Sequence, residues 1–252
     1  MSNQETEGII SKPLGNVQIG LYSSFVVPLT IVTLPLTTYL PKIYGELGIN
    51  LALMGIILLV ARASDVVTDP IIGILSDKTR SKIGRRKPWL IFGAVPLMVT
   101  TYLLFVPPDD VSLAYFLAVV ILTYLAYTIV SIPYLSWGAE MSGSYHERSR
   151  ITVTRESFQF FGYLLAALIP AIAQEAFGVT ELRDQVFLLA ISICALVPIV
   201  TILANVFVPE PKIPETQIER FTFEQYKKGF RFMMRNGPFV RVLIGLTGTV
   251  IG

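Results

Sequence analysis

Long apolar stretches alternate with short polar segments along most of this chain. Six stretches reach or approach the roughly 20 residues that a helix needs to cross a bilayer. They lie at residues 17–40, 51–76, 88–106, 111–137, 157–173 and 185–207, and a seventh apolar run begins at Phe239 and is cut off at Gly252. Only helices and closed barrels satisfy their backbone in lipid, and these runs are too long for barrel strands. The pattern therefore predicts an all-α membrane protein.

The composition agrees with this fold class and argues against several classes of function. Of 252 residues, 53% are hydrophobic and 15% are charged, whereas a soluble domain averages about 25% charged residues. Residues 1–16 are polar and lack the pattern of a secretory signal. Cys194 and His146 are each alone, so no His/Cys metal site is expected. With no Ser/His/Asp or cofactor constellation either, we expect no enzyme, no bound cofactor and no nucleic-acid partner.

The basic residues predict the orientation in the membrane. Placing the N-terminus in the cytoplasm puts 17 of the 20 Lys and Arg residues on the inner side, and Arg62 lies within the second span. Only Lys42 and Arg183 then lie in outer loops, as the positive-inside rule requires. This predicts a cytoplasmic N-terminus (1–16), a six-helix bundle (17–207), a cytoplasmic connector (208–238) and a truncated seventh helix (239–252).

The connector has two parts. Its beginning is Pro-rich, and its end, "FTFEQYKKGFRFMMRN", places apolar residues at helical spacing among basic ones. This spacing predicts an amphipathic helix, lying either on the inner membrane surface or under the bundle. Six spans, an inner connector and the start of a seventh span are typical of the first half of a two-half transporter, whose partner would be the C-terminal half.

The second span carries Arg62, Asp65 and Asp69 near its middle, where charges are costly and signal function. At about 100° per residue the three side chains project from one face. Pro70 and Gly73 follow, so the helix is expected to bend or to pack closely there. Two carboxylates and one guanidinium carry a net charge of −1, which suits one monovalent cation or one proton. The alternative is a structural Arg–Asp pair.

The loop "GILSDKTRSKIGRRKP" resembles the loop motif of the major facilitator superfamily. A narrower resemblance is to the glycoside–pentoside–hexuronide:cation symporters, the melibiose-carrier family. It rests on "RASDVVTDP" followed by "TRSKIGRRKPW", on "AYTIVSIPYLSWGAEMSGSYHERSRITVTRESF", and more weakly on "NGPFVRVL". The resemblance covers the chain but only half of a typical member.

That resemblance implies roles for several residues. Asp65 and Asp69 would be ligands of a transported Na⁺ or Li⁺ ion, Thr128 would add a hydroxyl, and Arg62 would balance the charge of the empty site. Oxygen ligands suit small hard cations. A proton is an equal option, because neighbouring carboxylates disfavour each other's ionised form.

The resemblance also implies a solute site and an inner gate. Tyr127 matches a sugar-contact position, although a packing role is open, and Arg155 can point toward an anionic solute group. Melibiose carriers hold sugar hydroxyls with two carboxylates, and their positions are Leu29 and Ser131 here, which argues against galactosides. The implied gate, alternatively solvated loop charge, comprises Gly73, Asp77, Arg85, Glu140, Arg148 and Arg150.

The expected function is a symporter that imports a sugar or glycoside-like solute with Na⁺, Li⁺ or H⁺ by alternating access. Its expected surroundings are the lipid bilayer of a bacterial plasma (inner) membrane. Two alternatives stay open: a carrier of the same fold with a non-sugar solute, and a membrane interaction protein that does not transport.

Overall fold

The computed structural model describes residues 14–211 and Gly237. The chain divides into two compact units, Met1–Lys212 and Ile213–Gly252, and the described helices all belong to the first unit. The predicted amphipathic helix, the seventh helix, most of the N-terminal segment and the "NGPFVRVL" block lie outside the described residues.

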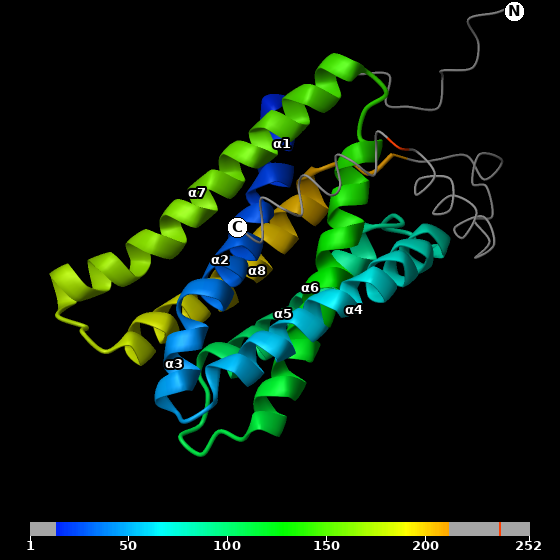
Figure 1. Ribbon diagram of the computed structural model, residues 1–252. Helices are drawn as coiled ribbons and strands as arrows, with labels where there is room; N and C mark the ends of the chain where they lie inside the picture. Colours follow the sequence, from blue (N-terminus) through cyan, green and yellow to red (C-terminus); the bar gives the residue numbers. More distant parts are fainter. Residues whose placement is uncertain (1–13, 212–236, 238–252) are drawn as a thin grey trace, which may run out of the picture. The chain divides into compact units, whose positions relative to one another are not determined.

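Helices make up nearly all of this unit, and no strand occurs in the part of the chain that is described (Figure 1). Among the described residues, six helices are long and apolar enough to span a membrane, the first of them formed by α1 and α2 together. The helices are α1 (Asn16–Ser24), α2 (Val26–Thr38), α3 (Leu40–Glu46), α4 (Leu51–Lys78), α5 (Lys87–Phe105), α6 (Leu113–Glu140), α7 (Tyr145–Phe177) and α8 (Leu182–Phe207).

Two helices begin where a side chain caps their first turn. The Asn50 side chain accepts from the backbone N–H groups of Ala52 and Leu53, at 2.9 and 3.3 Å, and so starts α4. The Ser112 hydroxyl accepts from Tyr115 N–H at 3.1 Å and starts α6. Such caps satisfy N–H groups that have no partner within the helix.

The first span is interrupted at Phe25, between α1 and α2. Pro28 explains the break, because it has no N–H to donate to the Ser24 carbonyl and its ring crowds that carbonyl. Phe25 N–H instead bonds back to the Tyr22 carbonyl at 3.2 Å, in a tighter turn. The first span is therefore divided by a one-residue interruption.

The fifth span is longer than the apolar pattern predicts. Helix α7 has 33 residues and begins at Tyr145, whereas the apolar run begins only at residue 157. A helix of that length measures about 50 Å, well beyond the ~30 Å hydrocarbon layer. The charged first turns therefore extend the same helix beyond its apolar run, which hydropathy alone does not detect.

Both consecutive helices and helices distant in sequence pack together in the bundle. Helix α6 packs against α4 and α5, α5 also packs against α8, and α7 packs against α1 and α2 (Figure 1). Gly162 permits the close approach of α7 to α2, because a Cβ there would lie 2.9 Å from the Thr30 Cβ and 3.1 Å from the Val27 carbonyl oxygen. Helices α4 and α7 have the smallest share of buried residues among the six spans. Most of their residues are therefore not buried within the described part of the bundle.

Candidate functional site

The intramembrane charges of α4 meet a hydroxyl from α6. Thr128 donates a hydrogen bond from its Oγ1 to Oδ1 of Asp69 at 3.0 Å. Thr128 is 3% exposed and Asp69 is half-buried, so the bond is partly shielded from water. Asp65 interacts electrostatically with both Asp69 and Arg62. The structure thus brings together the four residues that the sequence suggested for cation binding and charge balance.

Asp65 has an incompletely satisfied carboxylate. Its Oδ1 is buried and has no hydrogen-bond partner among the described residues. Burying such an oxygen without a donor is costly, which makes it a candidate ligand for an ion or a candidate acceptor of a proton. The side chains of Asp65, Asp69 and Thr128 supply oxygens of the type that Na⁺ and Li⁺ prefer.

The backbone of α4 is continuous through this region despite Pro70. Pro70 cannot donate to the Val66 carbonyl, so that oxygen loses its usual helical donor. The hydroxyls of Ser64 and Thr68 bond within the helix, to the Ala61 carbonyl at 2.6 Å and the Ser64 carbonyl at 3.2 Å. These bonds use the hydroxyl protons within α4 itself, which leaves Thr128 as the hydroxyl donor to Asp69.

The candidate solute residues divide between two positions. Tyr127 precedes Thr128 on α6 and is in electrostatic range of Arg62, Asp65 and Asp69. Ser131 is one turn further along α6 and is buried. Leu29 lies in the apolar core of the bundle, 3% exposed.

Arg155 occupies the other position, on α7. Its guanidinium is hydrogen-bonded to Glu156, and it is in electrostatic range of Tyr22 and Tyr134. The side chain therefore reaches toward α1 and α6.

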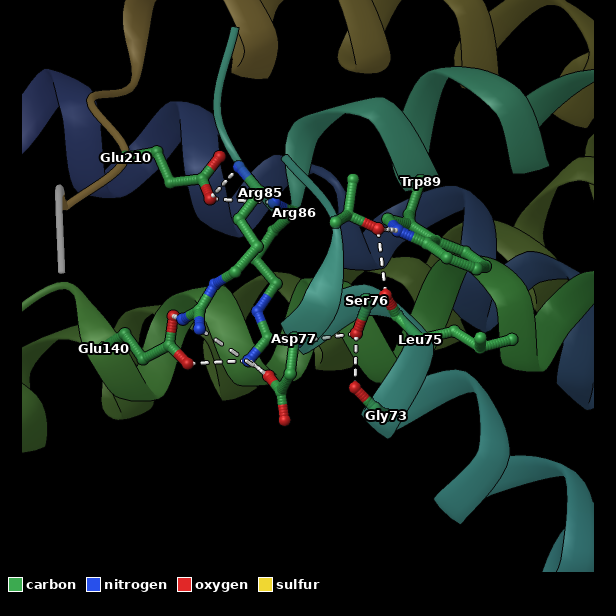
Figure 2. Close-up of polar contacts among 10 residues, drawn as sticks. Gly73, Leu75, Ser76, Asp77, Arg85, Arg86, Trp89, Glu140 and Glu210 are labelled. Atoms are coloured by element: carbon green, nitrogen blue, oxygen red, sulfur yellow. Dashed lines mark hydrogen bonds and ion pairs between the residues drawn. The ribbon is translucent and has the colours of Figure 1, made fainter. Parts of the chain in front are cut away.

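A charge network joins the C-terminal ends of α4 and α6 to the start of α5 (Figure 2). Arg86 is its centre, since it bonds Glu140 at 2.7 Å and Ser76 Oγ at 2.6 Å and forms an ion pair with Asp77. Arg85 bonds Glu140 at 2.8 Å and lies 3.9 Å from Asp77. Arg86 is 3% exposed, whereas the side chains of Glu140 and Asp77 are 24% and 41% exposed, so the network is buried at its centre and partly open to solvent at its acidic members.

Glu210, just beyond α8, anchors the loop that carries these arginines. Its Oε1 accepts from the backbone N–H groups of Arg85 and Arg86, each at 2.7 Å (Figure 2). Its Oε2 accepts from Lys87 N–H at 3.3 Å. A carboxylate at a helix N-terminus is favourable because it meets free N–H groups and the positive end of the helix dipole. Sequence reasoning missed Arg86 as the centre of the network and missed Glu210 altogether. The sequence offered one signal. An acidic residue follows a span closely, on the same predicted side of the membrane as a run of three basic residues.

The remaining predicted gate residues have other partners. Arg148 donates from Nε to the Ser142 carbonyl at 2.5 Å, and Arg150 donates to the Leu14 carbonyl. Glu147 accepts from Leu14 N–H and from Ser142 Oγ, both at 2.6 Å. These bonds fix the segment before α1 to the turn between α6 and α7. A Cβ on Gly73 would meet Ile132 at an ordinary 3.8 Å, so no close approach requires glycine there.

Six apolar helices, with a carboxylate pair inside one of them, define an integral multi-pass membrane protein. Residues 21–251 match the family described as MFS/sugar transport protein. The chain belongs to this family, whose members are transporters and not enzymes.

Curated relatives carry compatible names. An uncharacterized symporter, sll1374, of Synechocystis sp. is 36% identical over 58% of this chain and 29% of its own length. The putative glycoside/cation symporter YagG of Escherichia coli is 34% identical over 45% and 25%. An isoprimeverose transporter of Lactiplantibacillus pentosus is 27% identical over 82% and 44%. The chain thus spans less than half the length of each of these relatives.

Proposed function

We propose that this chain supplies the cation-binding half of a secondary symporter that imports a sugar or glycoside-like solute with Na⁺, Li⁺ or H⁺. The observation that carries the proposal is the hydrogen bond from Thr128 to Asp69 beside the unsatisfied Oδ1 of Asp65. Relatives named as a glycoside/cation symporter and an isoprimeverose transporter support the same class of activity.

The charge of the site accounts for coupling to one monovalent ion. Asp65 and Asp69 together outweigh Arg62 by one negative charge, and excess charge inside a membrane is costly. A bound Na⁺, Li⁺ or H⁺ removes that excess. Tyr127 shares this electrostatic environment, so the ion also changes the field at the neighbouring solute position. The cation therefore binds first and prepares the site for the solute.

The cytoplasmic network supplies an inner gate. Arg85 and Arg86 hold Asp77 at the end of α4 and Glu140 at the end of α6. Such a network stabilises the arrangement in which these helix ends are together. Alternating access then requires its contacts to weaken while this bundle rocks against the C-terminal half of the carrier. We place the protein in a bacterial inner membrane with a cytoplasmic N-terminus, in line with its basic inner loops.

One observation favours a second candidate, a carrier of this fold with a non-sugar solute. Leu29 is packed in the core and Ser131 is uncharged, so the two carboxylates by which melibiose carriers hold sugar hydroxyls are both absent. Uptake assays with sugars, nucleosides and organic acids separate this candidate from the first.

Uptake by full-length protein in right-side-out membrane vesicles tests the proposal. We expect Asp65→Cys and Asp69→Cys each to abolish solute accumulation driven by an Na⁺, Li⁺ or proton gradient. Asp109→Cys is the matched control, because Asp109 is a largely exposed carboxylate in an outer turn, paired with Arg183. Uphill accumulation by either site variant at the wild-type level refutes the cation-site assignment.

A further inference from the structure

The last turn of α8 contains a carbonyl group that its own helix cannot satisfy. Pro209 has no backbone N–H, so it cannot donate to the Asn205 carbonyl four residues earlier. The missing donor comes from α5, because Lys87 Nζ donates to the Asn205 carbonyl oxygen at 2.8 Å. The Lys87 ammonium thereby caps the C-terminal end of α8, where the helix dipole favours a positive charge.

A tryptophan of α6 completes this attachment. Lys87 Nζ lies 5.6 Å from the centre of the Trp137 ring, within the range of a cation–π contact. The Trp137 indole N–H donates to the Pro209 carbonyl oxygen at 3.3 Å. Lys87 is 9% exposed, and Trp137 and Val208 are fully buried. The start of α5 and the end of α6 therefore both hold the α8 exit, which we define as residues 205–210.

The α8 exit is attached beside the charge network described above. Lys87 follows Arg86 directly, and Trp137 lies three residues before Glu140, on the same part of α6. Glu210, the last residue of the α8 exit, accepts from the backbone N–H groups of Arg85 and Arg86. The α8 exit therefore contacts the same two helix ends that carry the arginines and the glutamate of the network.

The charge of Lys87 matters as well as its donor. A buried ammonium group is costly unless opposite charge compensates it. The three consecutive cations at residues 85–87 balance three carboxylates, which belong to Asp77, Glu140 and Glu210. A neutral side chain at position 87 would leave this set with one excess negative charge. Lys87 therefore supports both the attachment of α8 and the charge balance of the network.

We propose that the α8 exit is a strap across the inner gate, and that Lys87 and Trp137 are the positioning residues that fasten it. This inference rests on the proposed function, because it takes the Arg85–Arg86 network as the gate. The start of α5 and the end of α6 are both attached to the strap, so they separate only if at least one attachment breaks. The predicted connector begins at residue 208, within the strap, so a displacement of the connector acts directly on the gate.

Thiol labelling of the gate in full-length protein in membrane vesicles tests the strap. Ser76→Cys places the reporter inside the gate, because Ser76 is 0% exposed and its Oγ accepts from Arg86 at 2.6 Å. All other cysteines are replaced, and the reagent is N-ethylmaleimide, which crosses membranes. The labelling rate then follows the fraction of time for which the gate is open.

Two substitutions unfasten the strap in different ways. Lys87→Met removes the ammonium group but keeps a long side chain, and we expect labelling at position 76 to be about tenfold faster. Trp137→Phe keeps a ring for Lys87 but removes the donor to Pro209, and we expect labelling to be about threefold faster or more. Lys82→Met is the matched control, because it removes an exposed lysine of the same loop and should leave the rate unchanged.

A second reporter separates a strap from a merely structural role. Thr101 is also 0% exposed, lies near the opposite end of α5, and has a hydroxyl with no hydrogen-bond partner among the described residues. Thr101→Cys therefore reports general loosening of the bundle, and we expect its labelling rate to stay at the wild-type value in both strap variants. Equal acceleration at positions 76 and 101, or none at position 76, overturns the strap.

Arg86→Lys in the Ser76→Cys background tests the gate itself. If Arg86→Lys speeds labelling and the two strap variants do not, the strap is wrong and the proposed gate stands. If Arg86→Lys also leaves labelling at position 76 unchanged, the gate in the proposed function is wrong, and the strap with it.

Discussion

Removing the Thr128 hydroxyl while keeping its shape tests the cation site most sharply. Thr128→Val replaces the hydroxyl with a methyl group of similar size in a side chain that is 3% exposed. It deletes the donor that lies 3.0 Å from Asp69 Oδ1 and one oxygen that a cation would use. Serine at the same position retains the hydroxyl and is the matched control.

The size of the effect follows from the burial and charge of the partner. A hydrogen bond to a charged group contributes about 1.5–3 kcal/mol, and each 1.4 kcal/mol is tenfold in affinity. We therefore expect Thr128→Val to raise the cation concentration for half-maximal solute uptake by about tenfold or more. Thr128→Ser stays close to wild type.

The assay is initial solute uptake in vesicles over a series of Na⁺ and Li⁺ concentrations, with expression measured in parallel. The solute concentration is kept constant, so that a change in cation dependence is separated from a change in protein amount. Thr128→Val with a wild-type cation dependence and normal expression would show that the hydroxyl is not part of the ion site.

Three further predictions concern the packing and the inner network. A Cβ on Gly138 would lie 2.0 Å from the Tyr22 hydroxyl, so Gly138→Ala should destabilise the purified protein by about 1–3 kcal/mol in thermal unfolding; an unchanged unfolding temperature contradicts the tight packing. Glu210→Ala removes the acceptor of three backbone N–H groups at the start of α5 and should lower stability by about 1–2 kcal/mol, more than Glu181→Ala, whose side chain caps no N–H group of α8. Arg86→Lys keeps the charge but cannot hold Glu140, Asp77 and Ser76 together. An engineered cysteine near the Glu140 end of α6 should therefore react faster with a thiol reagent. An unchanged labelling rate argues against a gate.

The helices and the charged face of α4 are the parts that sequence reasoning predicts well. Continuous hydropathy identifies a span wherever the helix is apolar throughout, and the 3.6-residue period places Arg62, Asp65 and Asp69 on one face. Hydropathy does not predict the extent of α7, because the first turns of this helix are charged and lie beyond the apolar run. The break at Phe25 depends on a proline three residues later and gives no hydropathy signal.

Contacts between distant segments explain what sequence reasoning missed. Thr128 was expected through family resemblance and not from spacing, because no periodicity relates α4 to α6. Glu210 lies more than 120 positions from the N–H groups that it caps, so no local pattern connects them. Arg148 and Arg150 carry the charge that a gate needs, but their position on α7 gives them backbone partners at Ser142 and Leu14.

The central claim is that Asp65 and Asp69 hold the coupling ion, and direct ion binding to the purified full-length protein tests it. Titration calorimetry with Na⁺ and Li⁺, together with proton uptake measured by a pH indicator, counts the positive charges bound per chain without solute. We predict one positive charge bound by wild type, and none by Asp69→Asn or Asp65→Asn, while Asp109→Asn binds like wild type. Equal ion binding by wild type and by both site variants would contradict the claim.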